Sequence, residues 1–373
     1  MSEQRVWLRS SAIRDFRNLE QVDMDFPEAG LAIVGENGQG KTNLLEAIYY
    51  LQVLRSARGA RDQDVVRFGT RGFHIALNAR IDAEHVLGVG FDLAGRKKRV
   101  TMDGLPLARM SDAFGALPSV MFSPRDIQLV AGSPGERRRY LDLVLALSSR
   151  KYLSALQQYR AALLQRNAAL RDATRSGSGE DAVAAWEPAL AESGAVIVCD
   201  RAAWVAEHSP EFTEICVAIG EEGDPRMAYH SSFAREGDVR EMLATALDRQ
   251  RQHDLRRGMT HAGPHRDDLL ITLASRDLRA FGSAGQQRTA AIALRMLEAA
   301  TLRSTSRLEP LLLLDDPFAE LDVKRSERIL GLLQNAGLGQ TILCVPRAAD
   351  IPEELVQLER VRIESGTILQ TVA

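Results

Sequence analysis

The chain has 373 residues, of which 45% are hydrophobic and 26% charged, and its formal net charge at pH 7 is −3. Such a composition is that of a globular protein with two or three domains. The charge excludes a nucleic-acid binder that is basic throughout, although a local basic patch is compatible with it. The three cysteines show no metal-type spacing, which favours free thiols in a reducing cytosol. Without a signal-peptide pattern or a run of about 18 apolar residues, we expect a cytoplasmic protein that does not enter the membrane.

Strands dominate the first hundred residues, and helices follow. We expect strands at Val6–Ile13, Gln21–Phe26, Leu31–Val34, Phe73–Ile81, Val86–Leu93 and Lys98–Met102, with one helix after the third. From Glu136 to about His208 the periodicity is helical, with a loop at residues 176–179. Strand and turn character returns near Met259. It leads to a helix from Gln286, a strand at Leu311–Leu314, a helix from Val323, a strand at Thr341–Val345 and a hairpin turning at Ser365–Gly366.

This order predicts an α/β nucleotide-binding lobe that is split in sequence by a helical insertion. We place the first lobe at residues 1–120 and 256–373, and the helical lobe at residues 121–255.

Residues 35–42, Gly-Glu-Asn-Gly-Gln-Gly-Lys-Thr, match the phosphate-loop pattern. Glycines let the backbone N–H groups wrap a phosphate, the lysine neutralises the outer phosphates, and the threonine hydroxyl binds Mg²⁺. A short apolar strand precedes the loop and an apolar helix follows it, so the phosphates of ATP would lie at a helix N-terminus. The expected nucleotide contacts are Gly35, Glu36, Asn37, Gly38, Gln39, Gly40, Lys41, Thr42 and Asn43.

Two carboxylates follow the apolar strand at Leu311–Leu314. At this edge of a doubly wound sheet Asp315 is the candidate ligand of Mg²⁺, together with Thr42. Asp316 is the candidate that polarises the attacking water, with Lys41 as the catalytic cation. An ordinary helix cap after a core strand is the alternative interpretation of these aspartates.

A second anion-binding helix terminus is predicted where the segment Ser283-Ala284-Gly285-Gln286-Gln287 opens a helix. Two such termini in one chain suggest that one of them serves the nucleotide of a partner, and Ser283, Gly285 and Gln286 are the candidate contacts. A plain helix N-cap would explain the same residues.

The order of phosphate loop, insertion, signature and paired carboxylates resembles an ABC-type ATPase head (a P-loop sheet plus an antiparallel β subdomain) of the SMC-like repair ATPases. Residues 320–322, Glu-Leu-Asp, resemble the loop through which two such heads communicate, and Asp322 is also a candidate N-cap. Finer segments resemble the RecF family: residues 13–18, 38–49, 55–58, 122–126, 132–138, 263–268 and 283–289.

The resemblance implies a slow, DNA-stimulated ATPase that uses ATP and Mg²⁺ and dimerises on ATP, each signature closing the site of the other copy. It also implies binding of DNA at gaps or single-strand/double-strand boundaries. There the family works with RecO and RecR to load RecA, in recombinational repair, replication-fork recovery and the SOS response.

Other residues depart from the expected pattern or stay open. Cys344-Val345-Pro346 stands where a switch strand with a histidine is expected, and Asp126 is the only candidate for the position of the glutamine loop. The candidate phosphate contacts are Arg55, Arg58, Arg61, Arg137, Arg138 and Arg139, as DNA contacts or, for Arg58, as a contact of the nucleotide, with a solvated helix face as the alternative. For His261 and His265 we expect a loop-stabilising or interface role rather than metal binding.

Two alternative classes make different predictions. A transporter-type ATPase head predicts a switch histidine and no large insertion, and an SMC-like structural clasp predicts a long coiled coil or a zinc hook. The helical insertion and the missing heptad pattern favour neither.

Overall fold

The structure is a computed structural model that describes residues 4–176, 178–233, 237–318, 321–335, 337 and 339–369. The chain divides into two compact units: unit 1 is Met1–Asp126 with Glu298–Ala373, and unit 2 is Ile127–Leu297. The first boundary lies close to the predicted one, whereas the second falls after residue 297 instead of 255. The reason is that strand β10 (Arg226–His230) pairs antiparallel with β11 (Asp268–Leu273), which ties the segment after residue 255 to the helical unit. The predicted signature therefore belongs to unit 2.

Unit 1 contains a six-stranded sheet in the order β17-β16-β4-β15-β14-β9. Its members are β4 (Gly30–Val34), β9 (Ser119–Phe122), β14 (Leu311–Asp315), β15 (Thr341–Val345), β16 (Glu359–Glu364) and β17 (Thr367–Leu369). All pairs are parallel except β16 with β17. Strands β9, β14 and β15 are buried along their whole length, which is why they read as continuous apolar runs rather than as alternating ones.

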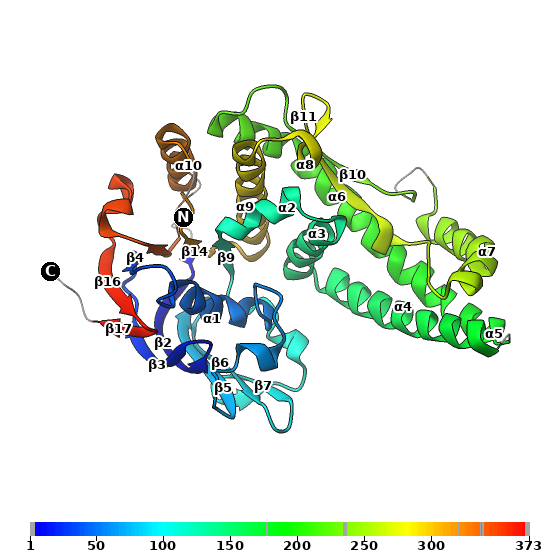
Figure 1. Ribbon diagram of the computed structural model, residues 1–373, viewed down its shortest axis with the longest axis horizontal. Coiled ribbons are helices and arrows are strands. Elements are labelled where there is room, and N and C mark those ends of the chain that lie inside the picture. The colour runs from blue at the N-terminus through cyan, green and yellow to red at the C-terminus, as the bar shows by residue number, and fades with distance from the viewer. Residues whose placement is uncertain are drawn as a thin grey trace. The chain divides into compact units, whose positions relative to one another are not determined.

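The second sheet of unit 1 is antiparallel, in the order β3-β2-β5-β6-β7-β8. Its members are β2 (Trp7–Phe16), β3 (Leu19–Asp25), β5 (Gly72–Arg80), β6 (Glu84–Asp92), β7 (Lys97–Met102) and β8 (Leu105–Pro106). Helix α1 (Lys41–Val53) contacts strands of both sheets, among them β14 and β9 of the first and β2 and β5 of the second (Figure 1). This position explains why α1 is buried nearly all round.

The remaining elements of unit 1 close its core. Helix α10 (Val323–Asn335) follows β14 in the chain and buries Ile329, Leu330 and Leu333. The short strands β1 (Gln4–Arg5) and β13 (Leu308–Glu309) pair in parallel.

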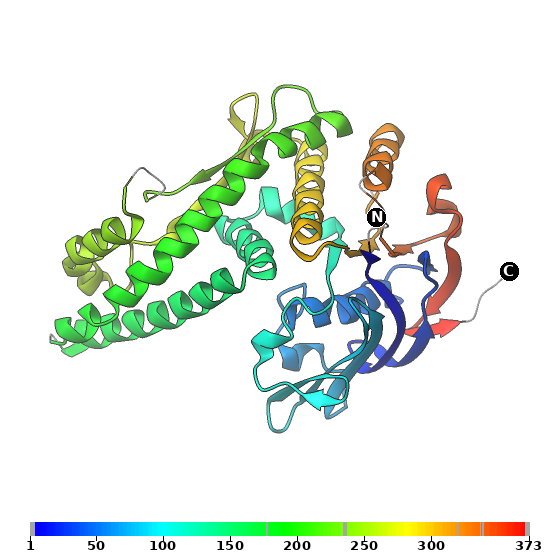
Figure 2. The same cartoon turned by 180° about the vertical axis from the view of Figure 1, so that it is seen from behind.

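Unit 2 is built on long helices, seen from behind in Figure 2. They are α3 (Pro134–Ser148), α4 (Arg150–Ser176), α6 (Glu187–Ile219) and α7 (Val239–Arg257), with the short α2 (Gln128–Ala131) and α5 (Glu180–Ala184). Helix α6 packs against both α4 and α7. The small sheet β10-β11-β12 ends at β12 (Arg276–Asp277) and leads to α8 (Leu278–Phe281) and α9 (Ala284–Ser306).

One helical stretch, Glu180–Ile219, is long and apolar enough to cross a membrane by length and composition alone. Helix α6 buries residues such as Ile197, Val198 and Phe212 within unit 2, as the core helix of a globular domain does. The sequence had indicated no such stretch, because the charged residues of α6 interrupt its apolar run.

The predicted strands of unit 1 are confirmed to within a few residues, as are the helix from Val323 and the terminal hairpin. Strands β9 and β10 and helix α7 were not predicted. Strand β9 is four residues long and has no alternation, so periodicity does not distinguish it from a loop next to proline.

Candidate nucleotide-binding site

The phosphate loop joins β4 to α1, as the sequence predicted. Gly38 and Gly40 adopt φ angles of 84° and 113°, in the left-handed region that favours glycine, so the chain turns sharply into the helix. No side chain caps the N-terminus of α1. The N–H groups of the first helical turn have no partner within the helix, and together with the helix dipole they form a site for an anion such as a phosphate.

Lys41 places a positive charge inside this loop. Its side chain is buried, and the ammonium Nζ donates to the carbonyl oxygens of Gly35 and Glu36, the latter at 2.9 Å. A buried ammonium whose hydrogen-bond acceptors among the described residues are neutral carbonyls is well suited to bind the outer phosphates of a nucleotide, since hydrogen bonds between charged groups are the stronger ones.

Thr42 and Asp315 meet although 273 residues separate them in the chain. The hydroxyl Oγ1 of Thr42 donates to both carboxylate oxygens of Asp315, at 2.9 and 3.0 Å. Burial raises the pKa of the Asp315 carboxyl, against the hydrogen bond from Thr42. A hydroxyl and a carboxylate at the mouth of a phosphate loop are hard oxygen donors of the kind that Mg²⁺ prefers, so these two residues fit the predicted ion.

Asp316 is the next residue and lies just after the end of β14, in a turn. Its φ is 46°, a left-handed conformation that aspartate tolerates better than most residues, and its N–H donates to the Cys344 carbonyl at 2.9 Å. The side chain is half-buried, in contrast to the buried Asp315. The turn thus gives the two neighbouring carboxylates different surroundings at the same edge of the sheet.

Strand β15 carries Cys344 next to the phosphate loop. The thiol Sγ donates to the Lys41 carbonyl at 3.8 Å, and burial raises its pKa well above the ordinary value. The side chain is therefore an inert neutral group where a switch residue was expected.

Two segments brace the phosphate loop in a way that sequence reasoning did not predict. The turn of the β16–β17 hairpin donates to Gln39 twice: Ser365 N–H to its side-chain Oε1 at 2.6 Å, and Gly366 N–H to its carbonyl at 2.8 Å. Asn18, from the β2–β3 turn, also donates to the Gln39 carbonyl and accepts from the Asn43 amide. Any side chain at Gly366 would collide with the Asn18 backbone.

Arg58, a candidate DNA contact, is engaged at the first helix of the site. The fully buried carboxylate of Glu46 accepts from Arg17, at 3.0 Å, and from Arg58, which also donates to Asn43. Burial raises the pKa of Glu46, but the hydrogen bonds from Arg58 and Arg17 outweigh it and hold the pKa below its usual value. Arg58 therefore lies beside the nucleotide site and has a structural role there.

The signature residues in unit 2 form a capping box at the start of α9. Ser283 N–H donates to the Gln286 side-chain Oε1 at 2.9 Å, and the Ser283 hydroxyl accepts from Gln286 N–H at 3.3 Å. Ser283 is exposed, and Gly285 lies within the first turn of the helix. The helix-cap interpretation is thus confirmed, and the exposed terminus is also open to a partner.

The arginine run at the start of α3 is largely turned inward. Arg137 is buried and forms a two-point ion pair with Asp268, at 2.8 Å, and Arg138 donates to the Asp267 carbonyl. Arg139 is exposed and pairs with Glu136 on its own helix. Arg137 is therefore wrong as a candidate DNA contact, because its charge is already neutralised inside unit 2.

Other predicted residues have structural roles. Asp126 accepts from Ser123 N–H at 2.7 Å and closes a turn. Asp322 accepts from Arg325 N–H and caps α10, as expected, whereas Glu320 lies outside the described residues.

His265 stabilises a loop of unit 2. Its ring accepts from the Tyr159 hydroxyl at 2.6 Å and donates to the Thr260 carbonyl, and burial lowers its pKa to about 4, so it is neutral. His261 bonds to Asp254. Among the described residues, no group of three or more His, Cys, Asp and Glu side chains could hold a metal ion.

The parallel sheet, the phosphate loop with its Thr42–Asp315 contact, the antiparallel β subdomain and the capped signature helix define an ABC-type ATPase head of the SMC-like kind. A family profile described as "RecF/RecN/SMC N terminal domain" matches residues 7–368. The chain is 31% identical to the DNA replication and repair protein RecF of Lachnoclostridium phytofermentans, covering 97% of this chain and 99% of that protein. It is 36% identical to RecF of Chloroflexus aurantiacus, covering 95% and 97%. The chain belongs to the RecF family.

Solved structures agree. A structure described as the recombination mediator protein RecF with ATP, in the RecFOR pathway, matches with a TM-score of 0.91 and 29% identity over 100% of this chain and 99% of that one. An Smc head domain from Pyrococcus furiosus matches with a TM-score of 0.57 at 17% identity, which shows the shared fold alone.

Proposed function

We propose that this chain is an ATP-dependent DNA-binding protein of recombinational repair and replication-fork recovery, active as a dimer that forms on ATP. The observation that carries the proposal is the contact between Thr42 of the phosphate loop and Asp315 at the end of β14. Binding of a nucleoside triphosphate together with Mg²⁺ requires hard oxygen donors next to a cation, and Thr42, Asp315 and the buried Lys41 supply them. Family membership supports the role in DNA replication and repair.

Each residue of the site has a distinct role in this proposal. The N–H groups of α1 and the Lys41 ammonium bind the phosphates, and Thr42 and Asp315 hold Mg²⁺, which would neutralise developing charge on the phosphates. Asp316 orients the attacking water and accepts its proton. Its more exposed carboxylate suits this task better than the buried Asp315. With a thiol in place of a switch histidine, we expect slow hydrolysis that DNA stimulates.

Dimerisation follows from the second helix terminus. The N-terminus of α9 points its Ser283 capping box to solvent, and we infer that it closes on the γ-phosphate of the other copy. ATP would then hold two copies together, while ADP would release them.

The proposed target is DNA at gaps or single-strand/double-strand boundaries. The proposed partners are mediators of the RecO and RecR type, with which the protein would help to load RecA. This activity would take place in the cytoplasm and support the SOS response. The RecFOR description of the solved relatives supports this part of the proposal.

DNA binding with and without nucleotide tests the proposal. We expect full-length protein with Mg²⁺ and a slowly hydrolysed ATP analogue to bind gapped DNA more tightly than intact duplex, and more tightly than it does with ADP. Asp316→Asn with ATP serves as a second trapped state. Equal affinity for all DNA forms, independent of nucleotide, would contradict the proposed function.

A further inference from the structure

One end of the antiparallel sheet of unit 1 carries four exposed cations: Arg71, Arg96, Lys97 and Arg99. None of the four forms an ion pair with a described residue. They are neighbours through the sheet, because Leu93 N–H donates to the Arg71 carbonyl and the β6–β7 turn that follows holds Arg96. We call these four residues, with Phe68, the basic sheet end.

The direction of the side chains on β7 follows from strand alternation. Lys98 lies on the inner side, donates to the Leu54 carbonyl and pairs with Asp62 at 2.8 Å. Lys97 and Arg99 therefore stand on the opposite, outer face. Arg99 is in register with Gly90, which is in turn in register with His74 of β5.

The aromatic side chain of Phe68 is fully exposed to solvent. Its exposure is 101%, the highest of the large hydrophobic side chains in the described part of the chain. It sits in the turn that precedes β5, where Thr70 N–H donates to the Arg67 carbonyl, three residues before Arg71. A single exposed ring is ordinary on a protein surface, but a ring beside four unneutralised cations is the combination that binds an unstacked nucleobase and its phosphates.

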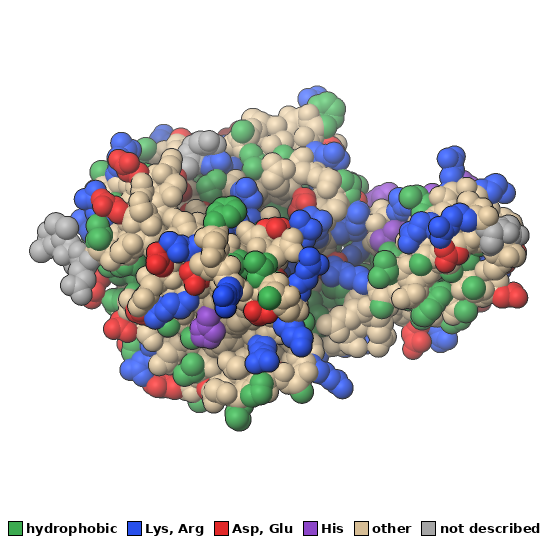
Figure 3. Space-filling model, turned by 60° about the horizontal axis from the view of Figure 1, so that its bottom comes forward, with side chains coloured by type: hydrophobic (Ala, Val, Ile, Leu, Met, Phe, Trp, Pro, Cys, Tyr) green, Lys and Arg blue, Asp and Glu red, His purple; other side chains and the backbone are tan. Residues whose placement is uncertain are grey.

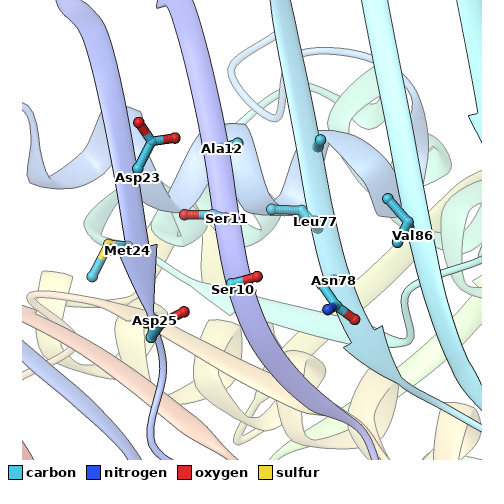
Figure 4. A pocket seen from close by; sticks show the side chains of 10 residues that line it. Ser10, Ser11, Ala12, Asp23, Met24, Asp25, Leu77, Asn78 and Val86 are labelled. Atoms are coloured by element: carbon cyan, nitrogen blue, oxygen red, sulfur yellow. The ribbon is translucent and has the colours of Figure 1, made fainter.

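Elsewhere on the outer face of the same sheet, acidic side chains are exposed or neutralise the arginines. Asp23 and Asp25 line a shallow hollow of about 450 Å³ on the outer face, with Ser10, Ala12 and Asn78 (Figure 4). Arg14 is neutralised by Asp23, and Arg67 by Glu20. Asp92 is in register with Lys97, lies next to the basic sheet end and accepts from Gly95 N–H. Unlike Arg14 and Arg67, the four cations of the basic sheet end have no ion pair with a described residue; Figure 3 shows the exposed side chains by type.

The basic sheet end is connected to the phosphate loop by backbone contacts. Arg67 N–H donates to the Asp15 carbonyl, and Arg17 N–H to the Val65 carbonyl, so the turn with Phe68 is fastened to the β2–β3 turn. From that turn Asn18 reaches Gln39 of the phosphate loop, and Arg17 reaches Glu46 of α1. A change in the loop on nucleotide binding thus has a short covalent and hydrogen-bonded route to this surface.

We propose that the basic sheet end binds DNA at a single-strand/double-strand boundary. Arg71, Arg96, Lys97 and Arg99 contact the phosphates, and Phe68 stacks on the unpaired base next to the last base pair. The inference rests on the proposed function and names the DNA-contacting surface within it.

Two full-length variants separate the two contributions. Arg71→Gln/Arg96→Gln/Lys97→Gln removes phosphate contacts, and Phe68→Ala removes the ring. Arg80→Gln, an exposed arginine at the far end of β5, and Leu105→Ala, an exposed apolar residue at the far end of the same sheet, are the matched controls. Affinity is measured by fluorescence anisotropy over a salt series on gapped and intact duplex DNA, with 2-aminopurine placed at the first unpaired base.

We expect the triple glutamine variant to bind both DNAs roughly tenfold more weakly and to lower the salt slope by about three, one for each lost phosphate contact. Phe68→Ala should lose about tenfold on gapped DNA, leave duplex binding unchanged, and abolish the quenching of 2-aminopurine. The two control variants should bind DNA as tightly as the wild type. All variants should unfold at the same temperature as the wild type.

Wild-type affinity and salt slope in the triple variant, or unchanged quenching in Phe68→Ala, would overturn this assignment while the proposed function stands. Absence of DNA binding by the wild type would instead refute the proposed function itself.

Discussion

Ser283→Arg distinguishes a helix cap from a residue that acts on a second copy. In the structure the serine is exposed and makes two capping interactions with Gln286, at 2.9 and 3.3 Å. Within one chain the arginine has free space, so only the cap is lost. Loss of an N-cap costs about 1 kcal/mol, which lowers Tm by about 2–4 °C in a domain of this size.

Ser283→Ala is the matched variant, because it loses the same hydroxyl and adds no bulk. If Ser283 is only a cap, the two variants should have equal, small losses of stability and normal function. If it closes the site of the other copy, both should bind ATP normally as single chains. Only the arginine variant should then fail in dimerisation, ATP hydrolysis and ATP-stimulated DNA binding.

The assays are differential scanning fluorimetry for stability, labelled-nucleotide titration for binding, and light scattering for dimerisation. Mixing Ser283→Arg with Lys41→Ala adds a complementation test, because one composite site of the mixed dimer carries both changes and the other neither. Hydrolysis should then partly return. Full activity of Ser283→Arg alone would refute the role across the dimer.

Three further predictions concern single residues. Lys41→Ala should nearly abolish nucleotide binding, since the phosphates lose their buried cation; unchanged affinity in a labelled-ATP titration would place the site elsewhere. Asp316→Asn should bind ATP normally but hydrolyse it far more slowly, because an amide accepts no proton; wild-type turnover in a phosphate-release assay would assign the base to another group. The depressed pKa of His265, about 4, means that its contribution to stability is complete above about pH 6.5 and is lost as pH falls towards 4. Over that range the free energy of unfolding should fall by about 3 kcal/mol more in the wild type than in His265→Asn. Parallel pH profiles of the two proteins would argue against a neutral buried ring.

The position of the phosphate loop between a strand and a helix was predictable because its residues are contiguous and lie between elements of strong pattern. The same is true of β14 and its two aspartates, whose apolar run ends in carboxylates. Thr42 and Asp315 were each predicted as site residues, but their hydrogen bond was not, because it depends on the parallel neighbours β4, β15 and β14.

Partners distant in sequence were not predictable. Gln39 is held by Ser365, and Glu46 by Arg17, through contacts that leave no local periodicity. The inward direction of Arg137 was missed for a similar reason, because a run of three arginines on a helix resembles a solvated face until Asp268 is placed against it. Strand β10 was too short, and its polar and apolar residues too irregular, to be predicted. Because β10 pairs with β11, missing it also placed the second boundary of unit 2 too early.

The most direct test of the account is the oligomeric state of the full-length protein as a function of nucleotide. Sedimentation velocity with Mg²⁺ and a slowly hydrolysed ATP analogue should show a dimer, and with ADP a monomer, because in the proposed dimer only the γ-phosphate would join the phosphate loop of one copy to α9 of the other. Lys41→Ala should stay monomeric in both. A wild-type protein that is monomeric with the saturating ATP analogue, at every concentration measured, would contradict the account.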